Sequence, residues 1–253
     1  IMKKMSFLAS KESGAIEALD RLRKIYGESP LDSADVIVAL GGDGFMLQTL
    51  HDSQTLGLPV YGMNYGTIGF LMNEFSFDNL AGRLNRAEET IINPLHMTAY
   101  CANGSVETAL AINEVSLLRS SAQAAKMRIS IDGKERMSEL VCDGALVSTP
   151  AGSTAYNYSA HGPILPIKSD VLALTAMAAY RPRRWRGAVL SSQAKIKFET
   201  LESDKRPVSA VADSLEVLNV LKLEIRSEKE IRHRLLFDPG HGLEERLISE
   251  QFS

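Results

Sequence analysis

The chain has 253 residues, of which 45% are hydrophobic, and this composition excludes a disordered chain and favours one large or two modest globular domains. Its formal net charge is −3, so no overall positive field would recruit nucleic acid or an anionic membrane. Neither the two cysteines nor the five histidines have metal-ligand spacing, and we expect free thiols in a reducing compartment. No apolar run approaches the length of a membrane span and the start lacks a signal-peptide core, which predicts a cytoplasmic protein.

The first part of the chain alternates strand-like and helix-like patterns. Residues 5–9 suit a strand, and a helix face is predicted from apolar side chains at every third position, Ile16, Leu19, Leu22 and Ile25. The apolar run 36–40 is rich in β-branched residues and predicts a strand buried on both faces. A helix to about residue 56, a strand at 58–63 and a helix over 77–89 should follow. This β-α-β-α-β order predicts a parallel sheet covered by helices.

After Asn93-Pro94 the period of hydrophobicity changes to two, which is typical of antiparallel strands. Residues 127–131 alternate in this way and run into Asp132-Gly133, a strong hairpin-turn dipeptide. The same alternation recurs at 195–199 and 221–226, whereas 171–179 has a helical pattern. These patterns predict a second domain that is all-β.

The change of period divides the chain into two expected domains. Residues 1–93 should form the α/β domain, and 94–235 the β-rich domain. The tail, 236–253, contains a turn and a short helix-like end that could return to the first domain.

The tetrapeptide Gly41-Gly42-Asp43-Gly44 directly follows the apolar run at 36–40. A strand, a glycine turn and a helix start place backbone N–H groups where a phosphate can bind. A carboxylate there repels phosphate unless it accepts a proton or meets a metal ion, so Asp43 is a candidate catalytic base. An ordinary aspartate has a pKa near ~3.9, so we expect Asp43 to be ionised without special tuning. The alternative is a tight turn in which Asp43 only caps the helix.

A dense polar cluster occupies residues 143–157 and combines an Asp-Gly turn, a short strand, a Pro/Gly-rich turn, hydroxyls and an aromatic ring. Ser153 or Thr154 could cap a short helix that contains Tyr156. A ring that stacks on a base, with hydroxyls and the Asn157 amide around it, is what a nucleoside pocket needs. Taken alone, the Asp-Gly dipeptide would be an ordinary hairpin turn and Tyr156 a core aromatic.

These blocks together resemble the NAD kinase family. Its hallmarks are a GGDG turn, an Asn-Glu pair and a DG…STPxGSTAYN segment, and they stand here in that order at 41–44, 113–114 and 143–157. A further family stretch, Gly-x-Asn-x-Gly-x-x-Gly-Phe, matches 62–70. The resemblance covers roughly 36–215 and implies a Rossmann-like α/β domain followed by a β-sandwich-like domain, in agreement with the change of period.

The resemblance implies transfer of the γ-phosphoryl group of ATP, or of polyphosphate, to the 2′-hydroxyl of the adenosine ribose of NAD, giving NADP. Asp43 would be the general base, and Mg²⁺ would offset the triphosphate charge. The backbone of Gly41, Gly42 and Gly44 would contact the phosphates. GGDG alone is weaker support, because lipid kinases and phosphofructokinases also carry it.

The resemblance also implies a set of dinucleotide-binding residues. Asn113 and Glu114 would hold the ribose and adenine, Asp143 the nicotinamide end, and Phe70 and Asp213 would lie near the dinucleotide. The adenine pocket would be lined from the STPxGSTAYN segment and the residues after it, namely Thr154, Ala155, Tyr156 and Ser159. Two further positions match residues that contact NAD in a neighbouring subunit, which implies a homodimer or homotetramer: Ala178 and Tyr180.

Two departures from the family pattern and two other functions are open at this point. Val141 stands where many relatives carry a basic residue, and alanines in 174–180 replace proline of some relatives. The basic-aromatic run 181–186 could grip phosphate, although a solvated or subunit-facing loop is the preferred interpretation. A lipid or sugar kinase sharing the GGDG turn and a non-catalytic NAD(P) sensor are the alternative functions. No membrane-docking segment favours the lipid kinase, and a pure sensor gains nothing from Asp43.

Overall fold

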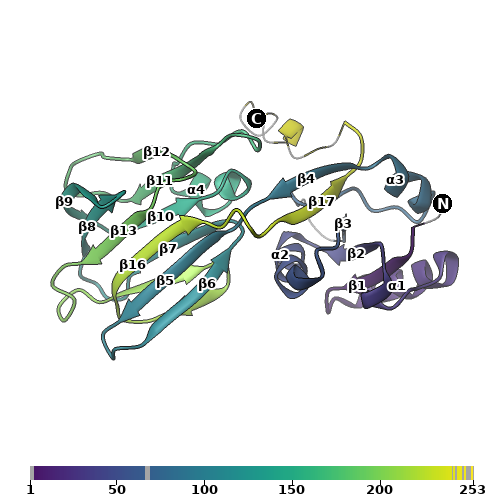
Figure 1. Ribbon diagram of the computed structural model, residues 1–253, viewed down its shortest axis with the longest axis horizontal. Helices are drawn as coiled ribbons and strands as arrows, with labels where there is room; N and C mark the ends of the chain where they lie inside the picture. Colours follow the sequence, from purple (N-terminus) through teal and green to yellow (C-terminus); the bar gives the residue numbers. More distant parts are fainter. Residues whose placement is uncertain are drawn as a thin grey trace. The chain divides into compact units, whose positions relative to one another are not determined.

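The computed structural model describes residues 3–65, 69–240, 242, 244–246, 248 and 252. The chain divides into two compact units, the first formed by Ile1–Ile92 with Ile231–Ser253 and the second by Asn93–Glu230 (Figure 1). Residues 66–68 of the predicted 62–70 motif lie outside the described residues, as do 241, 243, 247, 249–251 and 253 of the tail.

The first unit contains a five-stranded sheet in the order β1-β2-β3-β17-β4. Neighbouring strands are parallel except for β4, which is antiparallel to β17. The strands are β1 (Met5–Ala9), β2 (Val36–Gly41), β3 (Val60–Asn64), β4 (Glu88–Ile92) and β17 (His233–Phe237). The helices are α1 (Ser13–Tyr26), α2 (Asp43–Asp52) and α3 (Leu80–Arg86), with 3₁₀ turns at Leu31–Ser33 and Gln54–Leu56.

Helices cover both faces of this sheet, which explains the continuous apolar run in β2. Alternate residues of β2 join the core under α1 and α3, beginning with Val36. On the other face, Gly62 of β3 leaves space for Met46 of α2, since a Cβ at Gly62 would lie 2.5 Å from the Met46 methyl carbon. The predicted α/β domain is therefore confirmed.

The buried face of α1 differs from the predicted one. A spacing of three residues turns a helix by 300° per step, so the four predicted positions spread around the helix instead of forming one stripe. Ile16 and Ile25 are 46% and 51% exposed. The buried stripe follows the i, i+3, i+4, i+7 pattern at Ala15, Ala18, Leu19 and Leu22.

Two other elements of this unit differ from the sequence expectation. The helix predicted over 77–89 is shorter in the structure, where only α3 is helical. The residues from Glu88 onward form strand β4, which pairs with β17. Since β17 begins at His233 and belongs to the first unit, the second unit ends at Glu230 and not at 235.

The second unit contains two six-stranded antiparallel sheets, in the orders β12-β11-β10-β7-β14-β15 and β6-β5-β16-β13-β8-β9. The first sheet consists of β7 (Glu114–Arg119), β10 (Gly144–Ser148), β11 (Val171–Met177), β12 (Gly187–Ser191), β14 (Val208–Ala212) and β15 (Leu215–Val217). The second consists of β5 (Leu95–Cys101), β6 (Val106–Ala111), β8 (Ala125–Ile131), β9 (Lys134–Cys142), β13 (Ile196–Thr200) and β16 (Val220–Ser227). A 3₁₀ turn (Ala151–Thr154) and the short helix α4 (Tyr156–Ser159) follow β10.

The core of the second unit lies between the two sheets and is built from alternating inward side chains, including Met97 and Met127 from one sheet and Leu117 and Val147 from the other. This is the predicted β-sandwich-like domain, and it is confirmed. The helical expectation for 171–179 is wrong: Val171–Met177 is strand β11, between β10 and β12, and its central residues are buried. A strand buried on both faces shows no alternation, so its pattern resembles that of a buried helix.

We expect Leu22→Ala to lower the free energy of unfolding of the first unit by about 2–5 kcal/mol, because Leu22 lies on the buried face of α1 and is fully buried. Ile25→Ala, on the same helix but 51% exposed, should change it by no more than about 0.5 kcal/mol. Urea unfolding followed by far-UV circular dichroism measures both variants. Equal effects of the two substitutions would show that the assigned face of α1 is wrong.

Candidate functional site

The glycine turn in the first unit joins β2 to α2. Strand β2 ends at Gly41, Gly42 is the N-cap residue, and α2 begins at Asp43. A Cβ at Gly41 would lie 2.8 Å from the Phe45 side chain, whereas the Cβ positions of Gly42 and Gly44 face open space. The first turn of a helix has N–H groups without intrahelical partners, so this open turn can receive phosphate oxygens.

The carboxylate of Asp43 contacts the loop that follows β3. Its Oδ2 accepts the N–H of Phe70 at 2.7 Å, and its Oδ1 accepts the N–H of Leu71 at 2.8 Å. A Cβ at Gly69 would lie 2.7 Å from Oδ1, so a glycine there permits the close approach. The helix-cap interpretation of Asp43 is wrong, because Gly42 is the N-cap residue and Asp43 bonds to a distant loop.

Burial changes the acidity of Asp43. Desolvation raises the pKa of this carboxyl above its ordinary value, and the two N–H donors and the positive charge of Arg246 oppose that rise. The expectation of an untuned aspartate is therefore wrong. The sequence around Asp43 could not show this, because the burial arises from residues far away in the chain.

In the second unit, antiparallel pairing brings the ends of three adjacent strands, β10, β7 and β14, together at one end of the sheet. Glu114 at the start of β7 is paired with Ser148 at the end of β10, and the next residue of β7 is paired with Ala212 at the end of β14. Asp213 follows β14 directly and has a positive φ of 49°. Its carboxylate accepts the N–H groups of Ile112 at 2.7 Å and of Asn113 at 3.0 Å.

Hydrogen bonds hold the STPxGSTAYN segment at the same strand ends. The Thr149 hydroxyl donates to the Ile112 carbonyl at 2.7 Å, and the Thr149 N–H donates to the Asn113 carbonyl at 2.9 Å. A Cβ at Gly152 would lie 2.3 Å from that Asn113 oxygen, so only glycine allows this approach of two backbones. The motif therefore joins 112–114 to 148–157 through backbone contacts.

Several polar residues of this motif bind the protein itself. Asn157 is fully buried, and its amide nitrogen donates to the carbonyls of Ser153 and Pro163, each at 2.9 Å. Its amide oxygen accepts the Thr175 hydroxyl at 2.6 Å. The predicted capping of α4 by Ser153 or Thr154 is wrong, because Ala155 is the N-cap residue and no side chain caps the helix.

An open groove of about 740 Å³ lies beside α4 at the opposite end of strands β7 and β10. Four predicted residues line it: Asp143, Tyr156, Ser159 and Ala178. Its other lining residues are Leu118, Arg119, Ala160, His161 and Met177. The groove brings together an aromatic ring, a carboxylate and a hydroxyl, as a nucleoside pocket requires.

Arg119 is the charged groove residue that the sequence analysis missed. Its Nε lies 2.8 Å from an oxygen of Asp143, and its backbone N–H donates to the Asp143 carbonyl at 2.9 Å. The signal was the register: β7 ends at Arg119, and pairing with β10 places that end beside Asp143.

The remaining predicted residues lie outside this lining. Thr154 and Ala155 are half-buried in the segment that leads into α4, and Tyr180 is 58% exposed. Asn113, Glu114 and Asp213 form the strand-end group described above. Phe70 belongs to the first unit, where its N–H binds Asp43.

Burial changes the acidity of Glu114. Desolvation, and then the negative charge of Asp213, raise its pKa to about 7, although a backbone hydrogen bond from Tyr156 opposes the rise. Its buried Oε2 has no hydrogen-bond partner among the described residues. A buried acceptor without a donor is suited to a ligand hydroxyl.

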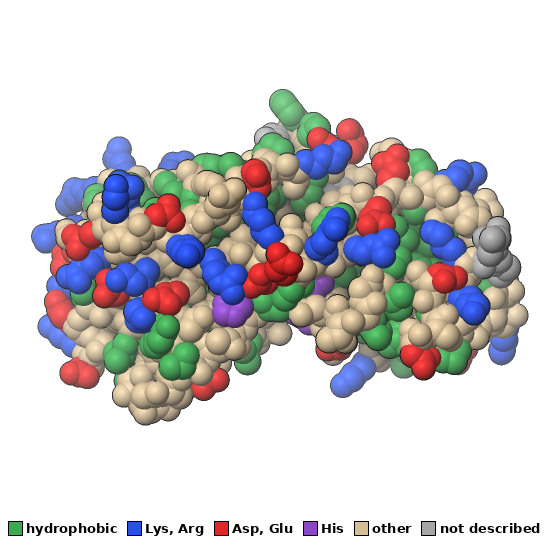
Figure 2. Space-filling view, in the orientation of Figure 1, with side chains coloured by type: hydrophobic (Ala, Val, Ile, Leu, Met, Phe, Trp, Pro, Cys, Tyr) green, Lys and Arg blue, Asp and Glu red, His purple; other side chains and the backbone are tan. Residues whose placement is uncertain are grey.

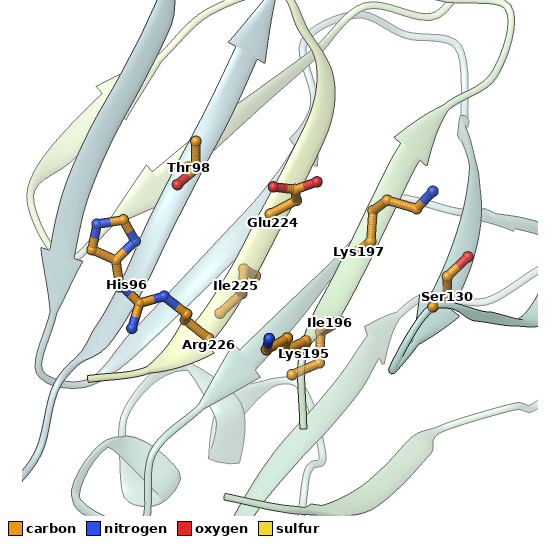
Figure 3. A pocket seen from close by; sticks show the side chains of 10 residues that line it. His96, Thr98, Ser130, Lys195, Ile196, Lys197, Glu224, Ile225 and Arg226 are labelled. Carbon is orange, nitrogen blue, oxygen red and sulfur yellow. The ribbon is translucent and has the colours of Figure 1, made fainter. Parts of the chain in front are cut away.

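A second cavity, of about 410 Å³, lies on the outer surface of the other sheet (Figure 3). Its lining comes from β5, β16, β13 and β8 and their turns and includes His96, Lys197 and Arg226. Lys197 pairs with Glu199 at 3.0 Å and Arg226 with Glu228 at 2.7 Å. Because both of these basic side chains are ion-paired with carboxylates, we interpret the cavity as part of the solvated sheet surface.

Three further findings concern surface charge, metal ligands and membrane-spanning helices. On the face shown in Figure 2, Lys and Arg side chains are interspersed with Asp and Glu. The described residues contain no group of three or more His, Cys, Asp or Glu side chains that could hold a metal ion. Within the same residues, no helix is long and apolar enough to span a membrane.

The raised pKa of Glu114 predicts a pH-dependent stability. Because the folded state favours the neutral acid, folding takes up a proton between the usual pKa of 4.5 and about 7. Stability therefore falls as pH rises through this window, and Glu114→Gln should remove on the order of 2–3 kcal/mol of that fall. Urea unfolding at pH 5 and pH 8, followed by the fluorescence of Trp185, measures it in the second unit. The exposed Glu107→Gln on β6 is the control, and an equal change there would refute the assignment.

The comparisons with known proteins agree with this arrangement. The family model for the ATP-NAD kinase N-terminal domain matches residues 3–91, and that for the ATP-NAD kinase C-terminal domain matches residues 112–227. The NAD kinase of Cereibacter sphaeroides (strain ATCC 17025 / ATH 2.4.3) is 64% identical over 99% of this chain and 98% of its own. The NAD kinase of Caulobacter vibrioides is 57% identical over 99% and 96%.

Two solved structures share the fold. An NAD kinase from Archaeoglobus fulgidus, in complex with ATP, aligns with a TM-score of 0.78 and 24% identity over 97% of this chain and 98% of its own. Yeast NADH kinase, complexed with NADH, aligns with a TM-score of 0.81 and 21% identity over 99% and 88%. With both family models matched and relatives this similar over nearly the whole length, the chain belongs to the NAD kinase family.

Proposed function

We propose that this member of the NAD kinase family transfers the γ-phosphoryl group of ATP to the 2′-hydroxyl of the adenosine ribose of NAD, with Asp43 as the general base. The observation that supports this most is a half-buried carboxylate at a glycine turn open to phosphate. A lipid or sugar kinase is not favoured, because the relatives are NAD kinases over nearly the full chain.

The environment of Asp43 suits proton abstraction. An alcohol is a poor nucleophile at pH 7, and a base is most effective when its pKa lies near the working pH, so the upward shift from burial helps. Each carboxylate oxygen accepts one N–H, from Phe70 or Leu71, and a carboxylate oxygen can accept two hydrogen bonds. One acceptor position on each oxygen is thus available to the substrate hydroxyl.

The phosphoryl transition state is loose, so positioning and charge neutralisation should contribute more than the base. We propose that the N–H groups of Gly42 and Gly44 contact the triphosphate. The described residues gather no set of metal-ligating side chains, so Mg²⁺ would be held chiefly by phosphate oxygens and would offset their charge. ATP is the donor we favour over polyphosphate, because both matched family models describe domains of ATP-NAD kinases.

The groove in the second unit is the proposed site for NAD. Tyr156 would stack on a base, while Ser159 and Asp143 would bind polar groups of the dinucleotide. The backbone hydrogen bond from Tyr156 to Glu114 connects the groove to the strand-end group, where the buried Oε2 of Glu114 would accept a ribose hydroxyl. Other predicted residues of the second unit would contribute through the backbone or through packing: Asn113, Thr154 and Ala155.

Asn157 would act indirectly, because its amide binds two carbonyls and the Thr175 hydroxyl, so we propose that it positions α4. Asp213 accepts the N–H groups of Ile112 and Asn113, so we propose that it positions 112–113 beside the dinucleotide. Ala178 and Tyr180 would contact NAD bound to a neighbouring subunit of a homodimer or homotetramer. The 58% exposure of Tyr180 is compatible with that contact.

We expect Asp43→Asn to lower kcat by roughly 10²–10⁴-fold, because an amide cannot take up the hydroxyl proton. The dissociation constant for NAD should change by no more than about threefold. A coupled assay for NADP formation from NAD, ATP and Mg²⁺ measures the first quantity, and titration calorimetry the second. Turnover at the parent rate in Asp43→Asn would exclude Asp43 as the base. Intact NAD binding without turnover in the parent protein would instead support a sensor.

We expect Tyr156→Ala to weaken NAD binding by about 1–3 kcal/mol, or roughly five- to 150-fold, because a base–aromatic stack is lost. Tyr158→Ala is the matched control, since Tyr158 belongs to the same helix and is 44% exposed but does not line the groove. Calorimetry with NAD measures both. Equal losses in the two variants would contradict the assignment of the groove.

A further inference from the structure

We infer that Arg246 is a positioning residue for Asp43, which holds the 69–71 turn against the carboxylate and supplies a positive charge beside it. The inference rests on the proposed role of Asp43 as general base. No sequence motif pointed to Arg246, which lies far along the chain within the described residues 244–246.

The geometry places Arg246 behind the turn that binds Asp43. Its Nη1 donates to the carbonyl of Gly69 at 2.9 Å and to that of Phe70 at 3.1 Å. The same turn donates the N–H groups of Phe70 and Leu71 to the two oxygens of Asp43, at 2.7 and 2.8 Å. Arg246 binds the carbonyls and Asp43 binds the amides, so the turn is held from both sides.

Arg246 is itself held in place by the first unit. Its guanidinium carbon lies 5.8 Å from the centroid of the Phe237 ring, in the cation–π range, and Phe237 is the fully buried last residue of β17. The side chain of Arg246 is only partly exposed to solvent. An arginine is suited to this position, since it stays charged and stacks on an aromatic face.

The charges around Asp43 give Arg246 its second effect. In the described part of the chain, burial raises the pKa of Asp43, while the two N–H groups and the Arg246 cation lower it. Asp238 is a second carboxylate that acts on Arg246 among the described residues. Asp238 is ion-paired with Arg83 and accepts the Tyr61 hydroxyl at 2.7 Å.

Loss of the Arg246 side chain should therefore have two consequences. The turn loses its grip on two carbonyls, so the Asp43 carboxylate becomes less well oriented. The pKa of Asp43 should also rise, because the positive charge that opposes the effect of burial is gone. More of the base is then protonated at a given pH, and the acidic limb of the kcat profile moves to higher pH. A residue with only a structural role would lower stability without moving that limb.

Kinetics across pH test the inference. Arg246→Ala should lower kcat at pH 7 by roughly ten- to a hundredfold and move the acidic limb upward. Arg246→Lys keeps the charge and should restore most of the limb position but only part of kcat. The control Arg234→Ala removes an arginine of the same unit, which pairs with Glu89 at 2.8 Å away from the turn, and should leave kcat and the limb unchanged. A parent-like kcat in Arg246→Ala, or a reduced kcat with an unmoved limb, would overturn the inference.

A measurement without turnover separates this inference from the role of Asp43. In protein labelled with ¹³C at the aspartate carboxyls, the resonance missing from Asp43→Asn identifies Asp43, and its titration gives the pKa directly. Arg246→Ala should raise that pKa by at least about half a unit, and Arg246→Lys by less. An unchanged titration would refute the inference even if Asp43 is the base. A shifted titration with full turnover in Asp43→Asn would uphold the effect of Arg246 on Asp43 and refute only the proposed base.

Discussion

The hydrogen bonds between the Asp43 carboxylate and the N–H groups of Phe70 and Leu71 organise the glycine turn of the first unit. A carboxylate out of water is costly unless donors surround it, so the chain must bring a turn to the start of α2. This requirement explains the glycine at position 69, because the Cβ of any other residue there would collide with the carboxylate. Burial still raises the pKa of Asp43, although these donors oppose the rise, and the glycine turn beside it stays open. A base beside phosphates requires this combination.

Asp213 and Glu114, the two acidic residues at the strand ends of the second unit, differ in role: one supports the backbone and the other can bind a ligand. Asp213 accepts two backbone N–H groups, and this shapes the 112–113 turn. Glu114 lies close enough to be affected by that negative charge, is desolvated by burial, and has an oxygen without a donor in the described structure. One carboxylate is engaged by the fold, and the other has acceptor capacity left for a ligand.

Features with a local signal could be predicted from the sequence, and features created by distant contacts could not. Strand β2, the glycine turn and the switch to an antiparallel sandwich follow from short patterns. The buried face of α1 and the strand at Val171–Met177 depend on what packs against them, so periodicity alone gave the wrong answer. In the site, the motif residues were visible, whereas Arg119 and Arg246 are linked to their partners only by strand register and by the returning tail.

The STPxGSTAYN segment shows why a motif is not a map of ligand contacts. The side chains of Thr149, Ser153 and Asn157 bind nearby backbone or a neighbouring hydroxyl, and Gly152 permits the approach to Asn113. Their common role is to build a loop that turns Tyr156 and Ser159 toward the groove. These residue types characterise the motif because few others would allow the same loop conformation. Ligand recognition depends on other groups, whose polar atoms are not engaged within the fold.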